Sequence, residues 1–354
     1  MATSGARYAP VSLVTTVLND LEGCRAFFAA MERQTLCPRE IVVVDGGSRD
    51  GTWEFLQAYC PRLDYRLVVA REDGCNVARG RNLAIQRATH DIIVSTDVGC
   101  QWDDRWLEEL AAPLLEDATL EAVMGSWMVR HEDLPDVWAR VEFAMHREFA
   151  LRATATSHAS SRAIAYRKHL WERLGGYPED LTLAADDMVF ALLLHATTTR
   201  VASAPTPRCF WERPATLRRF QREAERNFFG AGEADIWRTY GLLVGGRLLA
   251  EILTWLAWLP VGAIEMIWLG RMPIIGGLLL LTGAALTALR LWRLRGAMVR
   301  YRARGGRGGW WRIPLFDYAT KWSALRGYWR GWWQGRRRCR DCRRRLRQAG
   351  VSPW

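Results

Sequence analysis

The sequence lacks the features of several protein classes. Its first twenty residues hold no positively charged segment followed by a long apolar core, so they do not resemble a secretory signal peptide. We therefore expect the N-terminal domain to stay in the cytoplasm. Eight Cys in 354 residues are too few for a disulfide scaffold, and the six His show no pairwise spacing of metal ligands.

One CxxC, formed by Cys339 and Cys342, lies inside a run of Arg. A zinc site usually needs two further ligands at a defined spacing, and none lies nearby in the sequence. The favoured interpretation is a chance or structural thiol pair. Redox sensitivity is the alternative, since the flanking Arg would lower a thiol pKa.

Acidic residues are scarce at the C-terminal end. From Arg290 onward there are 19 Lys and Arg but only 2 Asp and Glu, a net charge of +17, whereas the preceding residues carry −6. The overall formal charge of +11 is therefore due to the C-terminal end of the chain. A basic segment beside apolar runs indicates anionic lipid headgroups as a partner, with nucleic acid as the weaker alternative.

Short apolar runs alternate with helical patterns in the first hundred residues. This alternation predicts an α/β fold with a mostly parallel sheet and helices on both faces. Strands are predicted at 10–18, 40–44, 65–70 and 91–96, and helices at 21–34, 52–59 and 76–88. The next part of the chain predicts a strand at 160–166 and helices at 104–115, 187–195 and 213–229.

Acidic and amide side chains follow three of these strands. Asn19 and Asp20 follow the first strand, Asp45 the second and Asp97 the fourth. Ligands of such sheets bind at the carboxyl ends of the strands, so we expect these residues on one rim. Asp45 also opens DGGSRDGT, whose glycines allow a tight turn and a close backbone approach to an anion.

Two apolar stretches, Leu248–Leu269 and Met272–Leu289, are each close to the length that spans a bilayer. The short connector at 270–273 predicts a hairpin with both ends on one side. The positive-inside rule places those ends in the cytoplasm, so we expect a cell-membrane protein with two transmembrane helices. Glu251 and Glu265 keep a buried soluble helix, or one partly in the interface, as an alternative for the first stretch.

These patterns divide the chain into three parts. We predict a cytoplasmic α/β domain at 1–238, a transmembrane hairpin at 242–292 and a basic amphipathic tail at 293–354, either cytoplasmic or interfacial. In the tail, Trp310, Trp311, Trp322, Trp329, Trp332 and Trp333 are interleaved with Arg. Trp and Arg together suit the headgroup layer, which favours lipid over nucleic acid.

An ordered set of motifs resembles family 2 glycosyltransferases with the GT-A fold. The set comprises VSLVTTVLND, VVVDGGSRDGT, ARGRNLAIQRA, DIIVSTDVGC, SSRAIAYRKHLWERLGGYPEDL and AADDMVF. The helix predicted near 213–234 resembles the segment that follows the catalytic domain in membrane-attached members. The resemblance covers about two thirds of the chain, and the order of the motifs is more specific than any one of them.

The resemblance implies roles for particular residues. Asp187 and Asp186 would both be catalytic residues, Asp187 as the base and Asp186 as its acidic neighbour. Nucleotide-sugar contacts are expected from Thr16, Asn19, Asp20, Asp45, Gly46, Arg81, Asn82, Asp97, Arg222 and Arg226. The acceptor side would include Ser160, Ser161 and Arg162, although a structural role for the two serines is the alternative. For Arg222 and Arg226 the alternative is a solvated or lipid-facing basic surface.

The family's metal motif, DxD, is incomplete in this sequence. Asp97 matches its first acid, which would hold Mn²⁺ or Mg²⁺ on the donor diphosphate, but the second position is Gly99. Such hard cations prefer carboxylate oxygens and stabilise the charge of the leaving group. Asp97 could act alone with water and phosphate oxygens, or Asp103 or another side chain could replace the missing acid.

We therefore expect an inverting glycosyltransferase that moves a sugar from a nucleotide donor to a membrane-proximal acceptor in cell-surface glycan or polysaccharide biosynthesis. The acceptor would be a lipid-linked sugar, a polyprenyl phosphate or a growing glycan. The alternative is a catalytically idle member of the same fold that acts as a membrane scaffold or glycan-binding protein, for which the incomplete DxD is the support. A processive synthase is disfavoured because one hairpin offers few helices to line a glycan channel.

Overall fold

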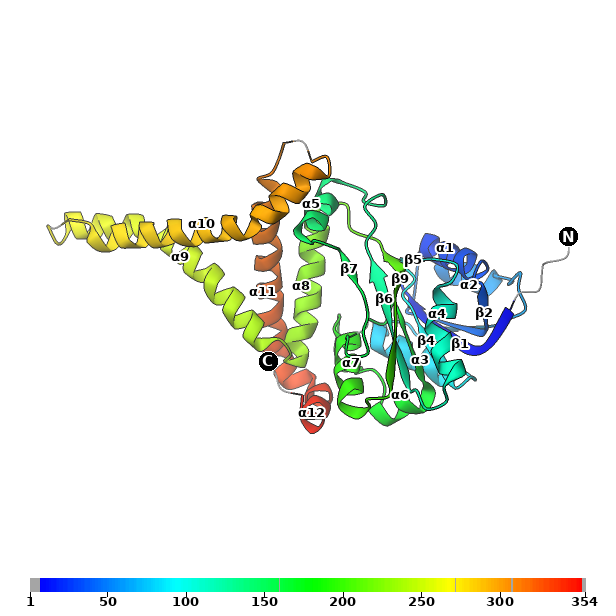
Figure 1. Cartoon of the computed structure of the whole chain (residues 1–354). Coiled ribbons are helices and arrows are strands. Elements are labelled where there is room, and N and C mark those ends of the chain that lie inside the picture. The colour runs from blue at the N-terminus through cyan, green and yellow to red at the C-terminus, as the bar shows by residue number, and fades with distance from the viewer. Residues whose placement is uncertain (1–6, 159, 271, 307, 352–354) are drawn as a thin grey trace.

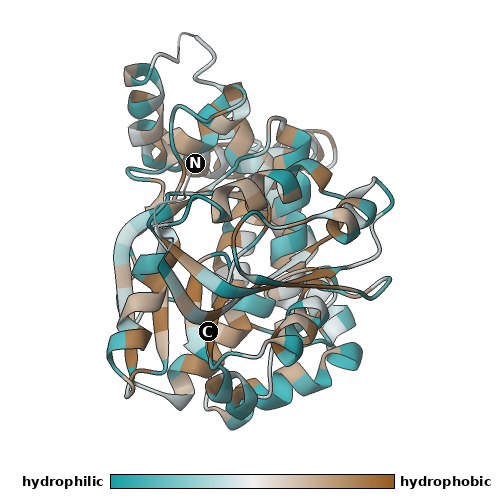
Figure 2. Cartoon of the chain, turned by 90° about the vertical axis from the view of Figure 1, so that its right-hand side faces the viewer, coloured by the Kyte–Doolittle hydropathy of each residue, from teal (hydrophilic) through white to brown (hydrophobic). Residues whose placement is uncertain are grey.

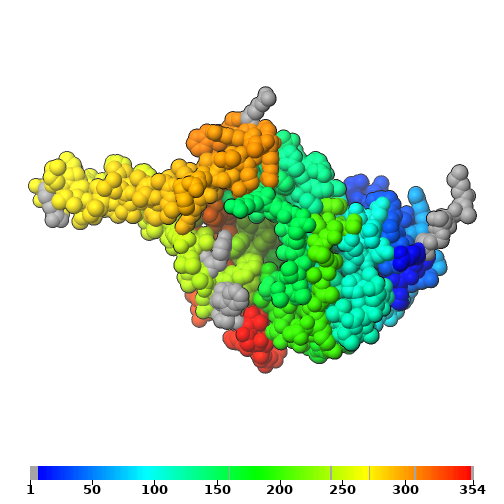
Figure 3. Space-filling model, in the orientation of Figure 1, coloured from blue at the N-terminus to red at the C-terminus, as the bar shows by residue number. Residues whose placement is uncertain are grey.

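The computed structural model describes residues 7–158, 160–270, 272–306 and 308–351. Arg271, in the connector predicted at 270–273, lies outside the described residues, as do the ends of the first and last predicted domains. The described part of the chain forms a sheet covered by helices, with a long helical arm on one side (Figure 1). The space-filling view shows how far this arm projects from the body (Figure 3).

One half of the sheet is parallel, as predicted. Its strands are β1 (Arg7–Val17), β2 (Leu36–Asp45), β3 (Arg66–Arg71) and β4 (Ile92–Ser95), in the order β3-β2-β1-β4. Val14 lies opposite both Val42 and Ser95 in the parallel register. Strands rich in Val and Ile that are buried on both faces are typical of such a sheet. Figure 2 shows hydrophobic residues (brown) on strands inside the body of the molecule.

The other half makes the sheet mixed. It contains β5 (Cys100–Trp102), β6 (Ala122–Met128), β7 (Ala150–Leu151), β8 (Ile164–Arg167) and β9 (Val201–Trp211). Among the described strands, four of the eight pairings are antiparallel, including β4 with β8 and β6 with β8. The α/β class is confirmed, but the expectation of a mostly parallel sheet holds only for β1 to β4. β8 lies between β4 and β6 and is antiparallel to both of them.

Helices cover both faces of the sheet, which confirms the predicted layers. They are α1 (Leu21–Met31), α2 (Thr52–Ala58), α3 (Val77–Arg87), α4 (Trp106–Glu116), α6 (Lys168–Leu174) and α7 (Asp186–Thr197). Helix α5 (Val137–Met145) belongs to a separate hydrophobic cluster. On one face, Phe27 and Leu107 pack in a core with α1 and α4. On the other, Ala84 and Phe190 pack in a core with α3, α6 and α7. The two cores fix the strand ends that carry the site.

The segment predicted as a basic tail packs against the rest of the folded chain. Helix α11 (Arg312–Arg338) runs along α8 (Leu217–Ala234), and α12 (Arg340–Gln348) packs on α7. Gly327, Gly331 and Gly335 are four residues apart, and each has the α8 backbone where a Cβ would lie. Small residues on one face permit this close approach. The tail is therefore part of the folded body, whereas its position relative to a membrane stays a prediction.

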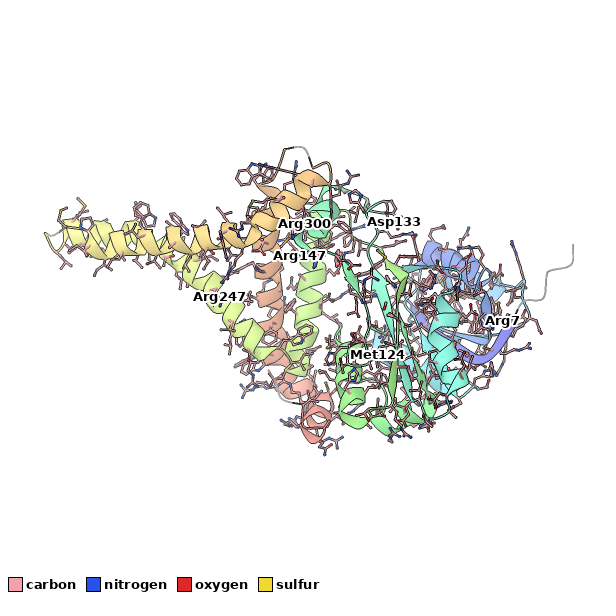
Figure 4. The ribbon with its side chains drawn as sticks, viewed as in Figure 1. Arg7, Met124, Asp133, Arg147, Arg247 and Arg300 are labelled. Carbon is pink, nitrogen blue, oxygen red and sulfur yellow. The ribbon has the colours of Figure 1, made fainter. Side chains whose placement is uncertain are left out.

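The arm consists of α9 (Arg238–Ile267) and α10 (Ile274–Ala303). By length and composition, Gly241–Ile267 and Ile274–Ala303 could each cross a membrane. Most of these apolar residues are exposed on the arm, unlike those of a soluble core helix. Helix α10 continues past the predicted boundary at 293, and near its end Arg300 donates 2.8 Å to the Ala144 carbonyl of α5 (Figure 4).

Glu251 and Glu265, the two acids in the first apolar stretch, both form hydrogen bonds with α10. Glu265 accepts hydrogen bonds from the Ile275 and Gly276 amides at 3.0 and 2.8 Å, so it caps the N-terminus of α10. Glu251 accepts from Thr287 at 2.8 Å and pairs with Arg290 at 2.7 Å. Each charge therefore has a partner inside the hairpin, which lowers its cost in an apolar surrounding.

Candidate active site

A pocket of about 400 Å³ opens where β1 and β4 end, beside the start of α7 and the end of α8. Four carboxylates and three guanidinium groups line it. They belong to Asp20, Asp97, Asp186, Asp187, Arg81, Arg162 and Arg226. The carboxyl ends of parallel strands thus supply one wall, as expected for this class of sheet.

Arg81 joins two of these acids. Its guanidinium donates to Asp97 at 2.6 Å and also to Asp186, and its side chain is only 5% exposed. The guanidinium lies 5.4 Å from the ring centroid of Tyr177, a favourable cation–π position. Its Nε has no hydrogen-bond partner among the described residues. One side chain from α3 therefore ties the end of β4 to the first turn of α7.

The two acids paired with Arg81 differ in their pKa. Burial would raise the pKa of Asp97, but the positive charges of Arg81 and Arg162 outweigh it and lower the pKa below its usual range. Burial raises the pKa of Asp186 to about 6, and the charges of Asp187 and Asp97 add to this effect against Arg81. At neutral pH Asp97 is fully ionised, while Asp186 titrates close to the physiological range.

Asp187 is the less buried acid at the start of α7. One carboxylate oxygen accepts from the Ser160 hydroxyl at 2.8 Å, and the other accepts from the Met188 amide at 2.8 Å. The preceding Ala185 has φ +72°, a left-handed conformation that turns the chain sharply into the helix. The helix N-terminus favours a negative charge at this position. Asp187 is thus an oriented carboxylate that lines the pocket.

The loop after β1 contributes part of the wall. Thr16 and Asp20 line the pocket, and Asp20 also caps α1 by accepting from the Gly23 amide at 3.0 Å. Asn19 has φ +53°, and its side-chain oxygen accepts from the Arg49 amide at 2.8 Å. Asn19 is therefore a turn residue that fixes the neighbouring loop, and its side chain does not line the pocket.

Asp45 and Gly46 do not line this pocket. The Asp45 side chain is fully buried, and its oxygens accept from the Gly47 and Ser48 amides at 3.1 and 3.0 Å. Gly47 has φ +101°, which explains a glycine in this turn. The structure therefore uses the Asp45 carboxylate to shape its own loop. Its expected contact with the nucleoside remains a prediction.

Asn82 is likewise occupied by the protein. Its amide nitrogen donates to the Tyr177 carbonyl and to Glu179, at 2.9 and 2.8 Å. Its oxygen accepts from Trp171 and from the Tyr177 amide, at 3.0 and 2.9 Å. These four bonds use its hydrogen-bonding capacity, since an amide offers two donors and an acceptor oxygen with two lone pairs. Asn82 holds the loop that leads to α7 and does not line the pocket.

The three residues expected on the acceptor side have different surroundings. Ser160 contacts Asp187, whereas Ser161 is buried and donates to the Tyr177 hydroxyl at 3.2 Å. Arg162 lines the pocket, with its guanidinium 4.2 Å from the ring centroid of Trp211. The geometry thus gives Ser161 a structural contact and leaves Ser160 and Arg162 at the pocket.

Helix α8 and the start of α9 close the other side. Arg226 lines the pocket, while Arg222, one turn earlier, is exposed and does not. Asn227 and Trp237 also line the pocket, and neither was predicted from the sequence. Trp237 has φ +59° at the turn between α8 and α9, so a tertiary turn and not a sequence motif brings it there.

A divalent cation would have one protein carboxylate here. Among the described residues, no group of three or more His, Cys, Asp and Glu side chains could hold a metal. Asp97 is 36% exposed, and the oxygen not bound by Arg81 makes no hydrogen bond to a described residue. Mg²⁺ sites often combine one or two carboxylates with substrate phosphates and water. The residues present fit that kind of cation site, in which a bound diphosphate completes the ligands.

Comparison with known proteins points to one family. Residues 12–175 match the model of the family described as Glycosyl transferase family 2. An O-antigen chain rhamnosyltransferase from Salmonella anatum is 25% identical over 179 residues, covering 48% of this chain and 56% of that protein. The glycosyltransferase AglE from Haloferax volcanii is 29% identical over 179 residues, covering 50% and 58%. The chain thus spans little more than half the length of these two relatives.

Solved structures with a similar backbone include a mannosyltransferase from Pyrobaculum calidifontis, determined with GDP-Man and Mn²⁺. It is 21% identical, covers 92% of this chain and 86% of that chain, and has a TM-score of 0.49.

Proposed function

Because the chain carries a glycosyl transferase family 2 domain in residues 12–175, we propose that it is an inverting glycosyltransferase acting in cell-surface glycan or polysaccharide biosynthesis. It would move a sugar from a nucleotide donor to an acceptor near the membrane. One observation carries this proposal: Asp97, joined to Asp186 by Arg81, lines the same pocket as the oriented carboxylate of Asp187. The proposed site for a diphosphate and the proposed base would then lie in one pocket.

The donor diphosphate would lie near the guanidinium groups. Arg162 and Arg226 line the pocket, and Arg226 forms no ion pair with a described residue. Guanidinium groups suit phosphate oxygens because their planar donors can bind two oxygens at once. Thr16 and Asp20, at the end of β1, would then contact the nucleoside.

The cation would be held by the free oxygen of Asp97 and by the donor. A bound Mn²⁺ or Mg²⁺ would stabilise the charge that develops on the diphosphate leaving group. Arg81 holds Asp97 in place, and together with Arg162 it keeps that carboxylate ionised. Gly99 lines the same pocket and leaves room where the second acid of the family motif would project.

Asp187 would act as the general base. An acceptor hydroxyl must lose its proton as it attacks the anomeric carbon, and a carboxylate within hydrogen-bond reach can take it. Ser160 and the Met188 amide fix the orientation of this carboxylate. Attack from the face opposite the diphosphate inverts the anomeric centre.

Asp186 would serve as a positioning residue. It is buried and bonded to Arg81, so it is poorly placed to meet an acceptor hydroxyl. Its pairing holds the Arg81 side chain against Asp97. The two adjacent acids would therefore have different roles, whereas the sequence predicts that both are catalytic.

The arm supports the proposal of a membrane-proximal acceptor. Arg226, Asn227 and Trp237 belong to the pocket, and α9 begins directly after Trp237. If the α9–α10 arm enters a bilayer, the pocket opens close to the membrane surface on the cytoplasmic side. A lipid-linked sugar, a polyprenyl phosphate or a growing glycan chain would meet this requirement.

The proposal is tested with a panel of sugar nucleotides and purified full-length protein. We expect one nucleotide class to raise the melting temperature more with Mn²⁺ or Mg²⁺ than with EDTA, and its sugar to appear on a lipid-linked acceptor with inverted configuration. Product stereochemistry is read by NMR. Retention of configuration would contradict the mechanism, and absence of binding to every nucleotide would favour the idle scaffold.

A further inference from the structure

A second pocket lies between three helices at the base of the arm. It has a volume of about 110 Å³ and lies among α9, α10 and α11. At roughly 30 Å³ for each water in the liquid, this space would hold about three or four waters. It is large enough for a phosphate group but too small for a sugar nucleotide. Its charged lining consists of Arg247, Glu251, Arg290, Arg293, Asp317 and Lys321.

The two acids of this pocket are already neutralised. Arg290 pairs with Glu251 and with Asp317, each at 2.7 Å. Lys321 pairs with Asp317 at 2.6 Å, and Tyr318 donates to Glu251. Two cations thus balance two carboxylates in one connected network. This network ties α9, α10 and α11 together and explains why the acids are buried.

Two further cations remain without a protein partner. Neither Arg247 of α9 nor Arg293 of α10 forms an ion pair or a side-chain hydrogen bond with a described residue. Both side chains belong to exposed residues that line the pocket. Figure 4 labels Arg247 on α9 near the base of the arm, where α9 and α10 diverge. The pocket therefore carries an uncompensated charge of two positive groups.

The position of the pocket along the arm is informative. The run from Ile274 to Leu289 contains no charged residue, and Arg290 follows it directly. These sixteen residues correspond to about 24 Å of helix, close to the roughly 30 Å hydrocarbon core of a bilayer. With the arm inserted, Arg290, Arg293 and Arg247 lie at the level of the lipid headgroups. Leu286 and Leu289, beside the same pocket, would face the acyl or prenyl chain.

We propose that this pocket binds the phosphate of a membrane lipid, with Arg247 and Arg293 as the ligands that neutralise it. A basic pocket between membrane helices on the cytoplasmic side suits an anionic headgroup, and guanidinium groups suit phosphate oxygens. The bound lipid would fill the space where α9 and α10 diverge and would hold the arm against α11. The inference rests on the membrane location of the arm proposed above, but it does not depend on sugar transfer.

The test uses the full-length protein in neutral detergent micelles, without sugar nucleotide. The probe is short-chain phosphatidic acid, titrated against the melting temperature. Phosphatidylcholine of the same chain length and inorganic phosphate are the comparison probes. The pocket variant carries Arg247→Gln and Arg293→Gln. The matched control carries Arg295→Gln and Arg302→Gln, which remove the same charge from α10 outside the pocket.

We expect phosphatidic acid to stabilise the wild type and the control to a similar extent, and to bind the pocket variant at least about tenfold more weakly. Because Arg247 and Arg293 belong to no ion pair with described residues, the pocket variant should melt normally without lipid. An equal loss of affinity in the control would overturn the proposal, since it would show unspecific attraction by charge. Equal stabilisation by inorganic phosphate would overturn the assignment to a lipid.

Discussion

Arg81 and Asp97 form a 2.6 Å ion pair that links helix α3 to the end of strand β4, and the same guanidinium also reaches Asp186 on α7. Two consecutive elements, α3 and β4, and the distant helix α7 are therefore held at one point of the pocket. This point lies where the donor diphosphate and its cation are proposed to bind. Much of the expected behaviour of mutants follows from this arrangement.

Replacing Arg81 should damage both stability and activity. In Arg81→Met two carboxylates lose their partner, and removal of one member of a buried ion pair typically costs about 3–5 kcal/mol. Because Asp97 is 36% exposed, we expect the lower end of that range. Arg81→Lys keeps the charge but cannot bridge two acids with a planar fork, so it should be intermediate. Thermal melting and donor binding check this order. Wild-type melting of Arg81→Met would contradict it.

The raised pKa of Asp186 gives a prediction on pH. A carboxyl whose pKa rises from its ordinary value to about 6 on folding stabilises the fold while it is protonated, and this contribution is lost as the pH rises through 6. The wild type should therefore lose stability relative to Asp186→Asn between about pH 4 and pH 6, the interval from the ordinary pKa of 3.8 to the raised one. The measurement is the difference between the two melting temperatures as a function of pH. A constant difference over this interval would show that Asp186 does not titrate there.

Helix α12 should support the loop that precedes Asp186 and Asp187. Arg345 donates to the Leu174 and Gly176 carbonyls at 2.6 and 2.5 Å, and Asp180 accepts from the Cys342 amide at 3.1 Å. Arg345→Met leaves these carbonyls without their donor and should lower the free energy of unfolding by about 1–3 kcal/mol. The adjacent Arg344→Met is the control, because Arg344 is exposed and pairs only with Asp341 among described residues. Equal melting of the two variants would refute this role.

The close approach of α8 and α11 should tolerate no added methyl group. A Cβ on Gly331 would overlap the Phe229 carbonyl, so Gly331→Ala forces the helices apart and should cost about 1–3 kcal/mol. Gly277→Ala on α10 is the matched control, since nothing lies within 4 Å of the position of its Cβ. The measurement is the melting temperature of both variants in the same detergent, and Gly331→Ala should melt at the lower temperature. Comparable effects of the two substitutions would argue against tight packing at Gly331.

The parallel half of the sheet could be predicted because β1, β2 and β4 are runs of buried Val and Ile ending at turn residues. Strands β6 and β9 were missed. Gly125 interrupts β6, and Pro205 and Pro207 interrupt β9, so neither shows the pattern of a regular strand. The helix α11 was missed because the Gly residues that let it pack on α8 weaken its helical signal. In each case the tertiary contact outweighs the local preference.

The site was predictable in part for a related reason. The ordered motifs predict Asp97 and Asp187 at one site, and both line the same pocket, since strand ends and helix starts determine where the backbone lies. Side-chain direction was not predictable in the same way. Asp45 follows its strand as Asp97 does, yet its carboxylate turns to the amides of its own loop. The bridge made by Arg81 joins residues 16 and 105 positions away, which local sequence cannot show.

The most direct test of the central claim is the rate of sugar transfer by Asp187→Asn compared with its affinity for the donor nucleotide. The control is Asp117→Asn, an acid on the surface after α4 and outside the pocket. We predict that Asp187→Asn lowers kcat by about 10²–10⁴, as expected for loss of a general base, while donor affinity stays near that of the wild type and the control remains active. Near-normal turnover by Asp187→Asn would contradict the proposed mechanism.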